Sequence, residues 1–407
     1  MTAVSMLVWN EFTNDARVLK EAQTLQKAGY VLTIHALHTP GVTEHVEELA
    51  GGIRVKRISR SPLWRLRNRK SFQRQGSASS KNHSIPVTPL RQGLRILARL
   101  WTHFGLLLSI VKARPGVIHA HDVNVLPTAW VASIICRIPL VYDAHEISTD
   151  REGYVNFRKI VGCVEKFIMP RAAGCITTTD ARSKFFARAY GIDRPLVLQN
   201  RPRYTSVERN STIRDCLKLT KSWPVVLYQG GLQQGRGLEK FVRLASEIPN
   251  AYFVLIGGGR LTSHLLSVVE DCKLNERVFF IPTITLNELP KFTASADIGV
   301  QPIENTCLNH FTTDSNKLFE YVIAGLPVVA SHLPEIAKVV QEFKLGLLAS
   351  PEGKEELRDA IIKLVDDESL RKKFSENAYK AALKLNWEVQ EGELVKLYNK
   401  VVAAEIL

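Results

Sequence analysis

The stretch VVLYQGGLQQGRG (Val225–Gly237), together with the predicted helix that follows it (Leu238–Glu247), decides the fold. Val225–Tyr228 is an uninterrupted apolar run, which is typical of a strand buried on both faces of a parallel sheet. The glycines after this run allow a tight turn and a close approach between the backbone and a ligand. A strand, a glycine-rich turn and a helix in this order predict an α/β domain with a parallel sheet.

The same alternation of strands and helices extends in both directions from this unit. The sequence predicts further strands in the C-terminal half at Tyr252–Ile256, Val278–Ile281, Ile298–Gln301, Pro327–Ala330 and Gly346–Leu348. It predicts strands in the N-terminal half at Val4–Trp9, Val31–Leu37, Ile53–Ile58, Gly116–Ala120, Pro139–Tyr142, Cys175–Thr178 and Leu196–Leu198. Short β-branched runs that alternate with helical segments indicate a doubly wound sheet in each half.

A polar stretch, Gln199–Ser222, separates the two halves. We therefore predict two doubly wound Rossmann-like domains, residues 1–199 and 200–385, that face each other across a cleft. A break at Asn386–Trp387 precedes a last amphipathic helix, and we expect residues 386–407 to pack back towards the N-terminal domain. Ligands of open parallel sheets bind beyond the carboxyl ends of the strands, so the residues that follow strands are the candidates for function.

The positive charge of the chain is concentrated in one segment. The 407 residues include 54 Lys and Arg and 40 Asp and Glu, a net charge of +14, yet no acidic residue occurs between Leu49 and His121. Residues 54–114 contribute 15 of the basic side chains. A local cationic surface attracts polyanions, which include phosphate groups, nucleic acids and anionic membranes.

Within this basic segment, Arg60–Pro89 is rich in Ser, Asn and Gln, which predicts an exposed, mobile loop. Leu90–Val111 then shows apolar residues at helical spacing, while Arg91, Arg95 and Arg99 recur every four residues. A basic amphipathic helix of this kind can lie in a membrane interface. It can equally pack its apolar side on a sheet and leave its arginines in solvent, so both interpretations stay open.

Three other features limit the class of protein. The six cysteines show no C-x-x-C spacing, so neither a disulfide framework nor a zinc ribbon is expected. The N-terminus has no basic region with a cleavage site, and we expect no signal peptide. We take Val125–Cys136 as the longest apolar stretch, and it is too short to cross a bilayer. We therefore expect a cytoplasmic protein whose contact with a membrane is limited to the surface.

The loop Gly230–Gly237 is a candidate phosphate site, because the helix start after it offers free amides and the positive end of a dipole. The loop matches neither G-x-x-x-x-G-K-[ST] nor G-x-G-x-x-G. Arg236 within it would supply a bidentate donor to phosphate. A second glycine run, Gly257–Gly259, follows the next strand. A plain tight turn would explain either run as well as a ligand would.

The segment DSNKLFEYVIAGLPVVAS (Asp314–Ser331) is more specific. Asn316 and Lys317 begin a predicted helix, where an ammonium group and several amides can hold a diphosphate. Glu320 follows within one turn and can accept hydrogen bonds from two hydroxyls, as in ribose recognition. The alternative is a capped surface helix in which Glu320 only favours the helix start.

Three histidines close two adjacent predicted strands: His119 and His121 end one, and His145, followed by Glu146, ends the next. We expect only one of His119 and His121 to face the cleft. His121 is the candidate for contact with a sugar or an acceptor. We do not expect a metal site built from His, Asp and Glu, since the chain has no D-x-D motif.

These motifs, in this order, resemble those of the retaining, group-1 (family 4) glycosyltransferases, which have the GT-B fold. NEFTNDARVLKEAQTLQKAGYVLTIHAL (Asn10–Leu37) is similar to the opening strand, helix and strand of that family. VIHAHDVNVLPTAW (Val117–Trp130) and PLVYDAHE (Pro139–Glu146) are similar to its acceptor-side loops. VLYQGGLQQGRGLEKFV, FVLIGGG, and ASADIGVQPI with NKLFEYVIAGLPVVAS are similar to its nucleotide-sugar half, so the resemblance covers nearly the whole chain.

The resemblance implies that a sugar is transferred from a nucleoside-diphosphate sugar, a co-substrate, with no cofactor and no metal. It implies donor contacts at Gly230, Gly231, Arg236, Gly258, Asn316, Lys317, Leu318 and Glu320. It implies acceptor contacts at Asn14, Asp15, His121, Asp122 and Glu146, and catalytic roles for His121, His145, Arg236 and Lys317. The family has two glutamates eight positions apart, but Thr312 stands at the first position here, and Asp314 and Glu304 are the candidates to replace it.

The implied acceptor is a hydroxyl of a glycan or of a polyprenyl-linked glycan in polysaccharide or glycoconjugate biosynthesis. Residues 54–114 add an anionic membrane surface as an expected partner. Two other functions stay open: a nucleotide-sugar 2-epimerase of the same fold, and a degenerate nucleotide-binding scaffold protein, which the missing glutamate would favour. Nucleic-acid binding is not expected, because few aromatic residues interleave with the basic ones.

Overall fold

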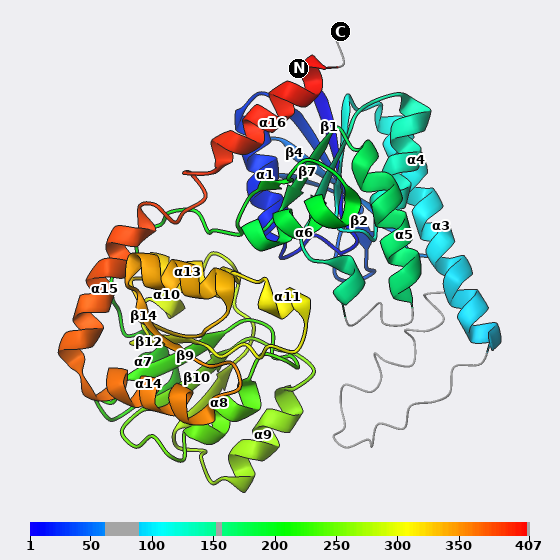
Figure 1. The fold of residues 1–407 in the computed structure, drawn as a ribbon. Helices are drawn as coiled ribbons and strands as arrows, with labels where there is room; N and C mark the ends of the chain where they lie inside the picture. Colours follow the sequence, from blue (N-terminus) through cyan, green and yellow to red (C-terminus); the bar gives the residue numbers. More distant parts are fainter. Residues whose placement is uncertain (62–88, 152–156, 405–407) are drawn as a thin grey trace.

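The computed structural model describes residues 1–61, 89–151 and 157–404 of the chain. In this part of the chain, two largely parallel sheets form separate α/β domains, which face each other (Figure 1). The predicted fold class, two doubly wound Rossmann-like domains, is thereby confirmed. The loop expected at Arg60–Pro89 falls almost entirely on residues 62–88, which lie outside the described residues.

The N-terminal sheet has the strand order β3-β4-β2-β1-β5-β6-β7-β8. Its strands are β1 (Ala3–Leu7), β2 (Val31–His38), β3 (Val46–Leu49), β4 (Ile53–Ser59), β5 (Val117–His121), β6 (Leu140–Ala144), β7 (Gly174–Thr177) and β8 (Leu196–Val197). Strands β2 and β5 flank β1, so the strand order reverses there, and ligands of such sheets bind at this point. The sequence analysis missed β3, because VEEL has no apolar run; it pairs antiparallel with β4 at the sheet edge.

Two hydrophobic layers cover the faces of this sheet. The helices of the domain are α1 (Ala16–Lys27), α3 (Pro89–Ala113), α4 (Leu126–Cys136), α5 (Arg158–Ile168) and α6 (Asp180–Tyr190), with the 3-10 turns η1 (Ser148–Asp150) and η3 (Met169–Arg171). Helix α1 begins after Asp15, whose Oδ1 accepts a hydrogen bond from the Val18 amide (3.2 Å). Its apolar residues Val18, Ala22 and Leu25 are fully buried, which fixes the start of the helix beside the carboxyl end of β1.

The C-terminal sheet has the strand order β11-β10-β9-β12-β13-β14. Its strands are β9 (Val225–Gln229), β10 (Tyr252–Ile256), β11 (Val278–Ile281), β12 (Ile298–Gln301), β13 (Val328–Ser331) and β14 (Gly346–Ala349). The helices are α7 (Thr212–Leu217), α8 (Leu238–Leu244), α9 (Thr262–Asp271), α10 (Leu289–Thr293), α11 (Leu308–Phe311), α12 (Asn316–Ile323), α13 (Pro334–Phe343), α14 (Lys354–Asp366) and α15 (Glu368–Ala382). Every strand pair in this sheet is parallel, so all carboxyl ends lie along one edge.

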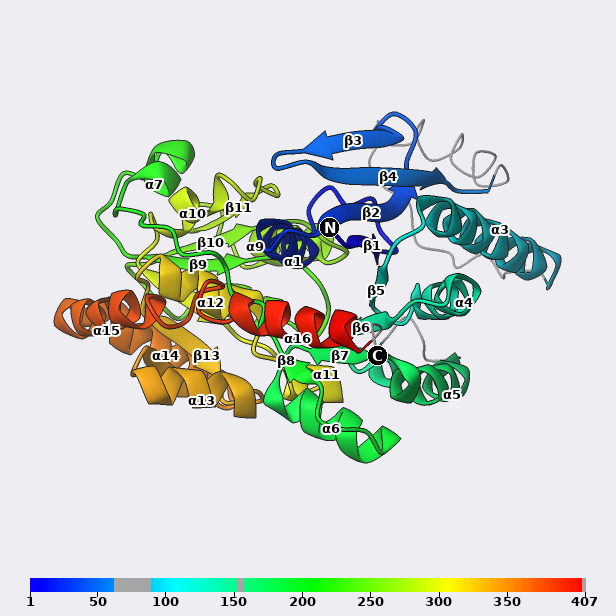
Figure 2. The same ribbon diagram turned by 90° about the horizontal axis from the view of Figure 1, so that it is seen from above.

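The last helix, α16 (Glu391–Ala403), leaves the C-terminal domain and packs on the N-terminal one. Figure 2 shows it between α15 and the N-terminal sheet. Trp387, Leu394 and Tyr398 belong to the N-terminal core. The indole Nε1 of Trp387 donates to Thr24 Oγ1 (2.8 Å), so a polar contact fixes the crossing as well. The domain boundary expected near residue 200 lies in the segment between β8 and α7.

Helix α3 corrects the expectation that Val125–Cys136 is the longest apolar stretch. Its residues Gln92–Ala113 have a mean hydropathy of 1.4 and are long and apolar enough, by length and composition, to cross a membrane. The arginines at every fourth position interrupt the apolar residues, so the sequence analysis did not treat this segment as one apolar stretch. The C-terminal half of the helix packs on the N-terminal sheet, where Leu106 and Ile110 are buried and Ser109 Oγ lies 3.0 Å from His35 Nδ1. This half is therefore a layer of the domain, whereas residues 92–100 are largely exposed.

Candidate active site

A cavity of about 410 Å³ lies between the two domains. The N-terminal domain contributes Arg17, His145, Glu146, Thr178 and Arg182 to its wall. The C-terminal domain contributes Gln229, Gly230, Gly231, Arg236, Leu289, Thr313, Asp314, Ser315, Asn316, Lys317 and Glu320, and Asn200 of the connecting segment completes the wall. Charged and polar groups dominate this wall, so the cavity suits a highly polar ligand.

Gly230 follows β9, and its backbone lies so close to Gly257 that a side chain at position 257 would not fit. Its amide donates to the Ile256 carbonyl (2.8 Å), and a Cβ atom on Gly257 would lie only 2.2 Å from its carbonyl oxygen. The two glycine runs are therefore pressed together. Gly258 is not among the residues that line the cavity, and its carbonyl accepts a hydrogen bond from the Leu232 amide (3.0 Å), which supports the loop.

Helix α12 directs its first turn at the cavity, with Asn316 and Lys317 in the wall. The first amides of a helix have no intrahelical partner, so this turn offers donors to an anion. Ser315, just before the helix, has φ 50°, a left-handed conformation that is costly for a residue with a side chain. The predicted donor residue Leu318 has its side chain buried in the C-terminal core, and its amide donates to the Ser315 carbonyl (3.2 Å).

Lys317 and Arg236 meet in this cavity from two different elements. The Lys317 ammonium lies along Gly230, because a Cβ atom built there would be 3.2 Å from Nζ. Burial, and then the charge of Arg236, lowers the pKa of Lys317 to about 7. Two cations this close repel each other in the empty site, so an anion between them would relieve the repulsion.

Glu320 lies one turn further along α12 and separates the main cavity from a second one of about 300 Å³. Both cavities share Asn200, Leu289, Asn316 and Glu320. Glu320 Oε2 accepts a hydrogen bond from Gln229 Nε2 (2.5 Å), which holds the carboxylate at the junction. A ligand with hydroxyl groups between a polyanionic part and a less polar part fits this arrangement, as a nucleotide does.

On the opposite wall, Arg17 of α1 forms an ion pair with Asp143 of β6, which is far away in the sequence. Its Nε and Nη2 donate to Asp143 Oδ2 (2.7 Å) and Oδ1 (2.9 Å), and its Nη1 donates to the Leu198 carbonyl (2.7 Å). Arg17 and Asp143 are both buried. His145 Nε2 lies 2.9 Å from Asp143 Oδ2. Burial would lower the pKa of His145, but Asp122 and Asp143 raise it to about 9, so this wall is cationic at neutral pH.

The histidines of β5 correct the expectation that only one of them faces the cleft. Residues two apart in a strand point to the same side, and the rings of His119 and His121 stack with centroids 4.2 Å apart. His119 Nδ1 lies 2.8 Å from the Tyr398 hydroxyl, which belongs to α16. His121 is 2 % exposed and reaches the cavity only through His145, whose Nε2 is 3.3 Å from its Nδ1. His145 is thus the histidine in the cavity wall.

The other predicted acceptor residues occupy three different places. Glu146 lines the cavity. Asp122 lies behind it, with Oδ2 3.7 Å from His145 Nδ1. Asn14 and Asp15 line a separate cavity of about 470 Å³, formed by the N-terminal domain with Leu286 of the C-terminal domain, and Asp15 also caps α1. The structure therefore does not bring Asn14 and Asp15 to the donor cavity.

Two family models match successive parts of the chain. The model described as "Glycosyl transferase 4-like domain" matches residues 15–201, and the one described as "Glycosyl transferases group 1" matches residues 210–381. The chain belongs to the group 1 glycosyltransferases. The predicted family is confirmed, and the cavity of this glycosyltransferase lies between the parts of the chain that the two models match.

Known proteins similar to this glycosyltransferase include several sugar transferases. It is 22% identical over 387 residues to the alpha-D-kanosaminyltransferase of Streptomyces kanamyceticus, covering 88% of this chain and 97% of that protein. Its structure is similar to that of a sucrose-phosphate synthase from Thermosynechococcus elongatus (TM-score 0.80, 19% identity, 99% of this chain and 100% of that one). It is also similar to Anabaena HepE in complex with UDP-glucose (TM-score 0.74, 17% identity, 98% and 100%).

Sequence reasoning missed Arg182, which joins the two domains of this glycosyltransferase. From α6, its Nη2 donates to the Asn309 carbonyl (3.1 Å) and its Nε donates to Thr312 Oγ1 (3.2 Å). Asn309 also exchanges two hydrogen bonds with the backbone of Ile147 (2.8 and 3.0 Å). Nothing in the local sequence distinguishes Arg182 from a solvated charge, because its partners in the other domain lie more than a hundred positions away.

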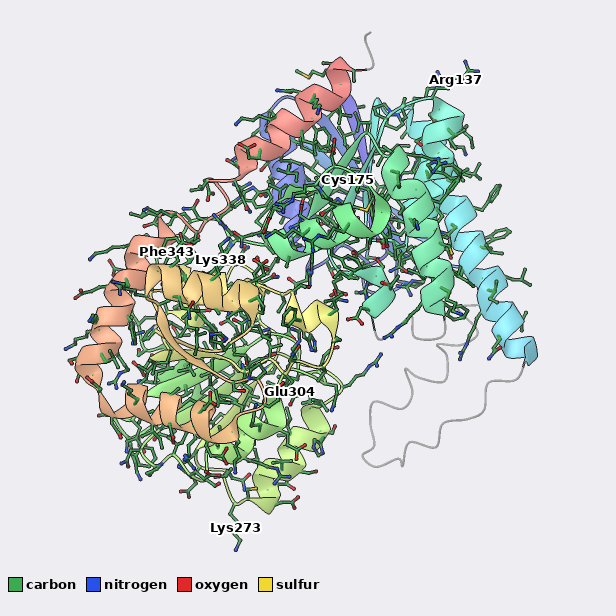
Figure 3. The ribbon with its side chains drawn as sticks, in the orientation of Figure 1. Arg137, Cys175, Lys273, Glu304, Lys338 and Phe343 are labelled. Carbon is green, nitrogen blue, oxygen red and sulfur yellow. The ribbon has the colours of Figure 1, made fainter. Side chains whose placement is uncertain are left out.

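Thr312, at the position of the family's first glutamate, is buried in this interface and does not line the cavity. Of its two candidate replacements, Asp314 lines the cavity and accepts a hydrogen bond from Gln199 Nε2 (3.0 Å). Burial raises the pKa of Asp314 to about 6. Glu304, labelled in Figure 3, belongs to the C-terminal domain and is not among the lining residues. Of the two candidates, only Asp314 therefore lines the cavity.

Among the described residues, one group of four has ligand atoms within 4.8 Å of one another and could hold a metal ion: Glu21, His119, His121 and Asp143. The fit is poor, because the Arg17 guanidinium already occupies both Asp143 oxygens and lies 3.2 Å from Glu21 Oε1. Burial, and then the charge of Asp143, raises the pKa of Glu21 to about 8, so its carboxyl group is protonated at neutral pH. We derive no metal chemistry from this group.

We expect the affinity of this site for a nucleoside diphosphate to fall as the pH rises above 7. Lys317 loses its proton near that pH in the empty site, and a bound diphosphate favours the protonated form. Binding then takes up a proton, so the dissociation constant should rise about tenfold between about pH 6 and about pH 8. Calorimetric titrations at both pH values measure this change. In Lys317→Arg the guanidinium stays charged and the tenfold change should be absent; the same change in that variant would contradict the assignment.

Proposed function

We propose that this glycosyltransferase moves a sugar from a nucleoside-diphosphate sugar to a hydroxyl of a lipid-linked or surface glycan. The observation that carries the donor assignment is the meeting of Lys317, Arg236 and the first turn of α12 in one cavity. Cleavage of the bond to the sugar leaves negative charge on the diphosphate. Fixed cations and amides at that position stabilise the developing charge, which is usually the largest contribution to catalysis.

The same groups make a metal ion unnecessary in the proposed reaction. Two cationic side chains and a helix start supply the charge that a divalent ion would otherwise supply. On this basis we propose a metal-independent reaction, and transfer should continue in an excess of EDTA.

We propose that the transferred sugar keeps its anomeric configuration. In a retaining reaction the departing phosphate can take the proton of the acceptor hydroxyl. A strong general base is then not required. His145, positioned by Asp143 and His121, would then orient the sugar, and Asp314 would bind its hydroxyls from the other wall. Nuclear magnetic resonance of the product with a defined donor reads the anomeric configuration directly.

The acceptor side of the proposal rests on the surface of α3. Leu97, Trp101 and Phe104 are 61%, 59% and 56% exposed, although each would gain from leaving water. Arg95 and Arg99 are exposed on the same helix. An apolar, basic helix surface fits the interface of an anionic membrane, so we propose that the protein acts in the cytoplasm as a peripheral protein at the inner face of the cell membrane.

We therefore expect the protein to co-sediment with vesicles of phosphatidylcholine and phosphatidylglycerol, and much less with phosphatidylcholine alone. Each basic side chain near an anionic surface contributes about 1 kcal/mol, so Arg95→Gln should weaken vesicle binding about fivefold. Added salt should weaken binding further, because it screens exposed charges. Lys338→Gln, on the C-terminal domain, is the matched control and should bind like the unaltered protein. Equal binding to both kinds of vesicle would overturn the membrane proposal.

Product analysis separates this function from its two alternatives. A nucleotide-sugar 2-epimerase would release an epimerised sugar in the absence of any acceptor, and a scaffold protein would bind the nucleotide without turnover. Transfer to an added acceptor, with the sugar otherwise unchanged, supports the glycosyltransferase.

A further inference from the structure

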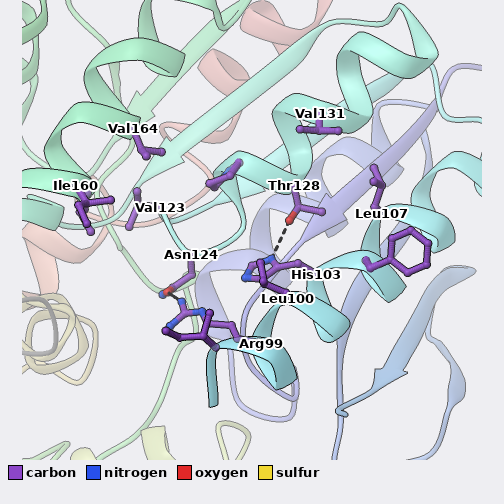
Figure 4. Close-up of a pocket in the computed structure, with 14 residues that line it drawn as sticks. Arg99, Leu100, His103, Leu107, Val123, Asn124, Thr128, Val131, Ile160 and Val164 are labelled. Carbon is purple, nitrogen blue, oxygen red and sulfur yellow. Dashed lines mark hydrogen bonds between the residues drawn. The ribbon is translucent and has the colours of Figure 1, made fainter. Parts of the chain in front are cut away.

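An apolar groove of about 550 Å³ lies on the N-terminal domain between α3, α4 and α5 (Figure 4). Leu100 and Leu107 of α3, Val131 of α4, and Ile160 and Val164 of α5 form its sides. The groove is separate from the donor cavity, with which it shares no lining residue. Leu100 and Ile160 remain 59% and 63% exposed, so the groove opens to the outside.

The polar side chains in the wall of this groove bond to one another. His103 Nδ1 lies 2.8 Å from Thr128 Oγ1, and Arg99 Nη2 donates to Asn124 Oδ1 (2.6 Å) (Figure 4). Burial, and then the charge of Arg99, lowers the pKa of His103 to about 4, so its ring is neutral. An extended peptide needs partners for its backbone, and this wall supplies few. A hydrocarbon chain needs none.

Among the described residues that line the groove, Arg99 is the one with a charged side chain. Its guanidinium is held over the Trp9 ring, 5.1 Å from the centroid, and Trp9 itself stacks on His103 at 4.3 Å. A fixed cation at the edge of an apolar groove matches a molecule with an anionic group at one end of a hydrocarbon chain.

One part of the groove wall is adjacent in sequence to the active site. Val123 and Asn124 line it, and they directly follow Asp122, whose carboxylate is 3.7 Å from His145 in the donor cavity. The exposed apolar side of α3 forms the opposite border. A chain in the groove would therefore lie between a membrane in contact with α3 and a loop that reaches the active site.

We propose that the groove binds the hydrocarbon chain of a lipid phosphate, with the phosphate at Arg99. This assignment rests on the proposed function, in which the acceptor is lipid-linked, and it adds the place where the lipid is held. It explains why α3, α4 and α5 leave an apolar space open beside a single arginine.

Calorimetric titration of the full chain with alkyl phosphates, below their micelle-forming concentrations, tests the proposal. A fully buried methylene group contributes about 0.8 kcal/mol. If the open groove half-buries each of the six additional methylene groups, dodecyl phosphate should bind about 50-fold more tightly than hexyl phosphate. Val131→Trp should fill the groove and abolish this gain. Ile135→Trp, on the same helix but outside the groove, is the matched control and should retain it.

Two further measurements test whether Arg99 binds the phosphate group and whether the ligand is a lipid phosphate or free phosphate. Arg99→Gln should weaken dodecyl phosphate binding several-fold and leave binding of the uncharged dodecyl maltoside unchanged. Inorganic phosphate should not displace dodecyl phosphate. Equal affinity for all chain lengths, or full binding in Val131→Trp, overturns the groove assignment. Binding of a nucleoside diphosphate does not depend on the groove, so these variants should bind it normally. If the unaltered protein binds no nucleoside diphosphate, the donor site is contradicted and the groove assignment is not.

Discussion

Lys317→Met is expected to weaken binding of a nucleoside diphosphate by about 10- to 100-fold. The ammonium group is buried against Gly230 in the donor cavity, and a hydrogen bond to a charged group contributes about 1.5–3 kcal/mol. Titration calorimetry with the nucleotide that gives the largest thermal shift measures the loss. Lys338→Met, an exposed lysine of α13 that is labelled in Figure 3, is the matched control and should bind normally.

The stability of the Lys317→Met variant separates a lost contact from a damaged fold. Burial lowers the pKa of Lys317 from its ordinary value near 10.5 to about 7, so the unfolded chain holds the proton more strongly. Between these two pKa values the buried lysine costs stability, and this cost shrinks as the pH rises. The variant should therefore be at least as stable as the unaltered protein at neutral pH. A variant that loses both affinity and stability would not support the assignment.

Arg17→Met is expected to lower the free energy of unfolding by about 3–5 kcal/mol, because it leaves Asp143 buried without its main counter-charge. The two groups form a pair of hydrogen bonds of 2.7 and 2.9 Å, and both are buried. Denaturant unfolding followed by circular dichroism measures the loss. Arg137→Met, a surface arginine on the same domain, is the control and should change stability little (Figure 3).

A second substitution shows whether the buried charge causes the loss. Arg17→Met combined with Asp143→Asn removes both charges and should recover part of the stability, since a neutral amide costs less to bury than a carboxylate. If the two losses simply add in the double variant, Arg17 acts through packing and not through Asp143.

The strands of the C-terminal domain were the most predictable part of the fold. Tyr252–Ile256, Val278–Ile281 and Ile298–Gln301 have the predicted bounds, because an apolar run that ends in a glycine, a proline or a polar residue marks a buried parallel strand clearly. Strand β3 was not predicted, because an edge strand whose side chains are largely exposed has no apolar run in its sequence. The span of α3 was predicted closely, as Leu90–Val111, but its high mean hydropathy was missed, because arginines interrupt its apolar residues in the sequence.

The donor side of the site was also easier to predict than the opposite wall. Lys317 and Glu320 stand three residues apart on one helix, so local spacing alone places them together. Arg17 and Asp143 are 126 positions apart, and only the sheet order brings α1 to β6. The resemblance also implied donor contacts at Leu318 and Gly258; the side chain of Leu318 lies in the core, and the Gly258 carbonyl accepts a hydrogen bond from the Leu232 amide.

A crystal structure with the tightest-binding nucleoside diphosphate tests the central claim most directly. We predict phosphate oxygens within hydrogen-bond distance of Lys317 Nζ, the Arg236 guanidinium and the amide of Asn316, with the ribose hydroxyls on Glu320. A diphosphate bound elsewhere, with these groups facing only solvent, would contradict the account.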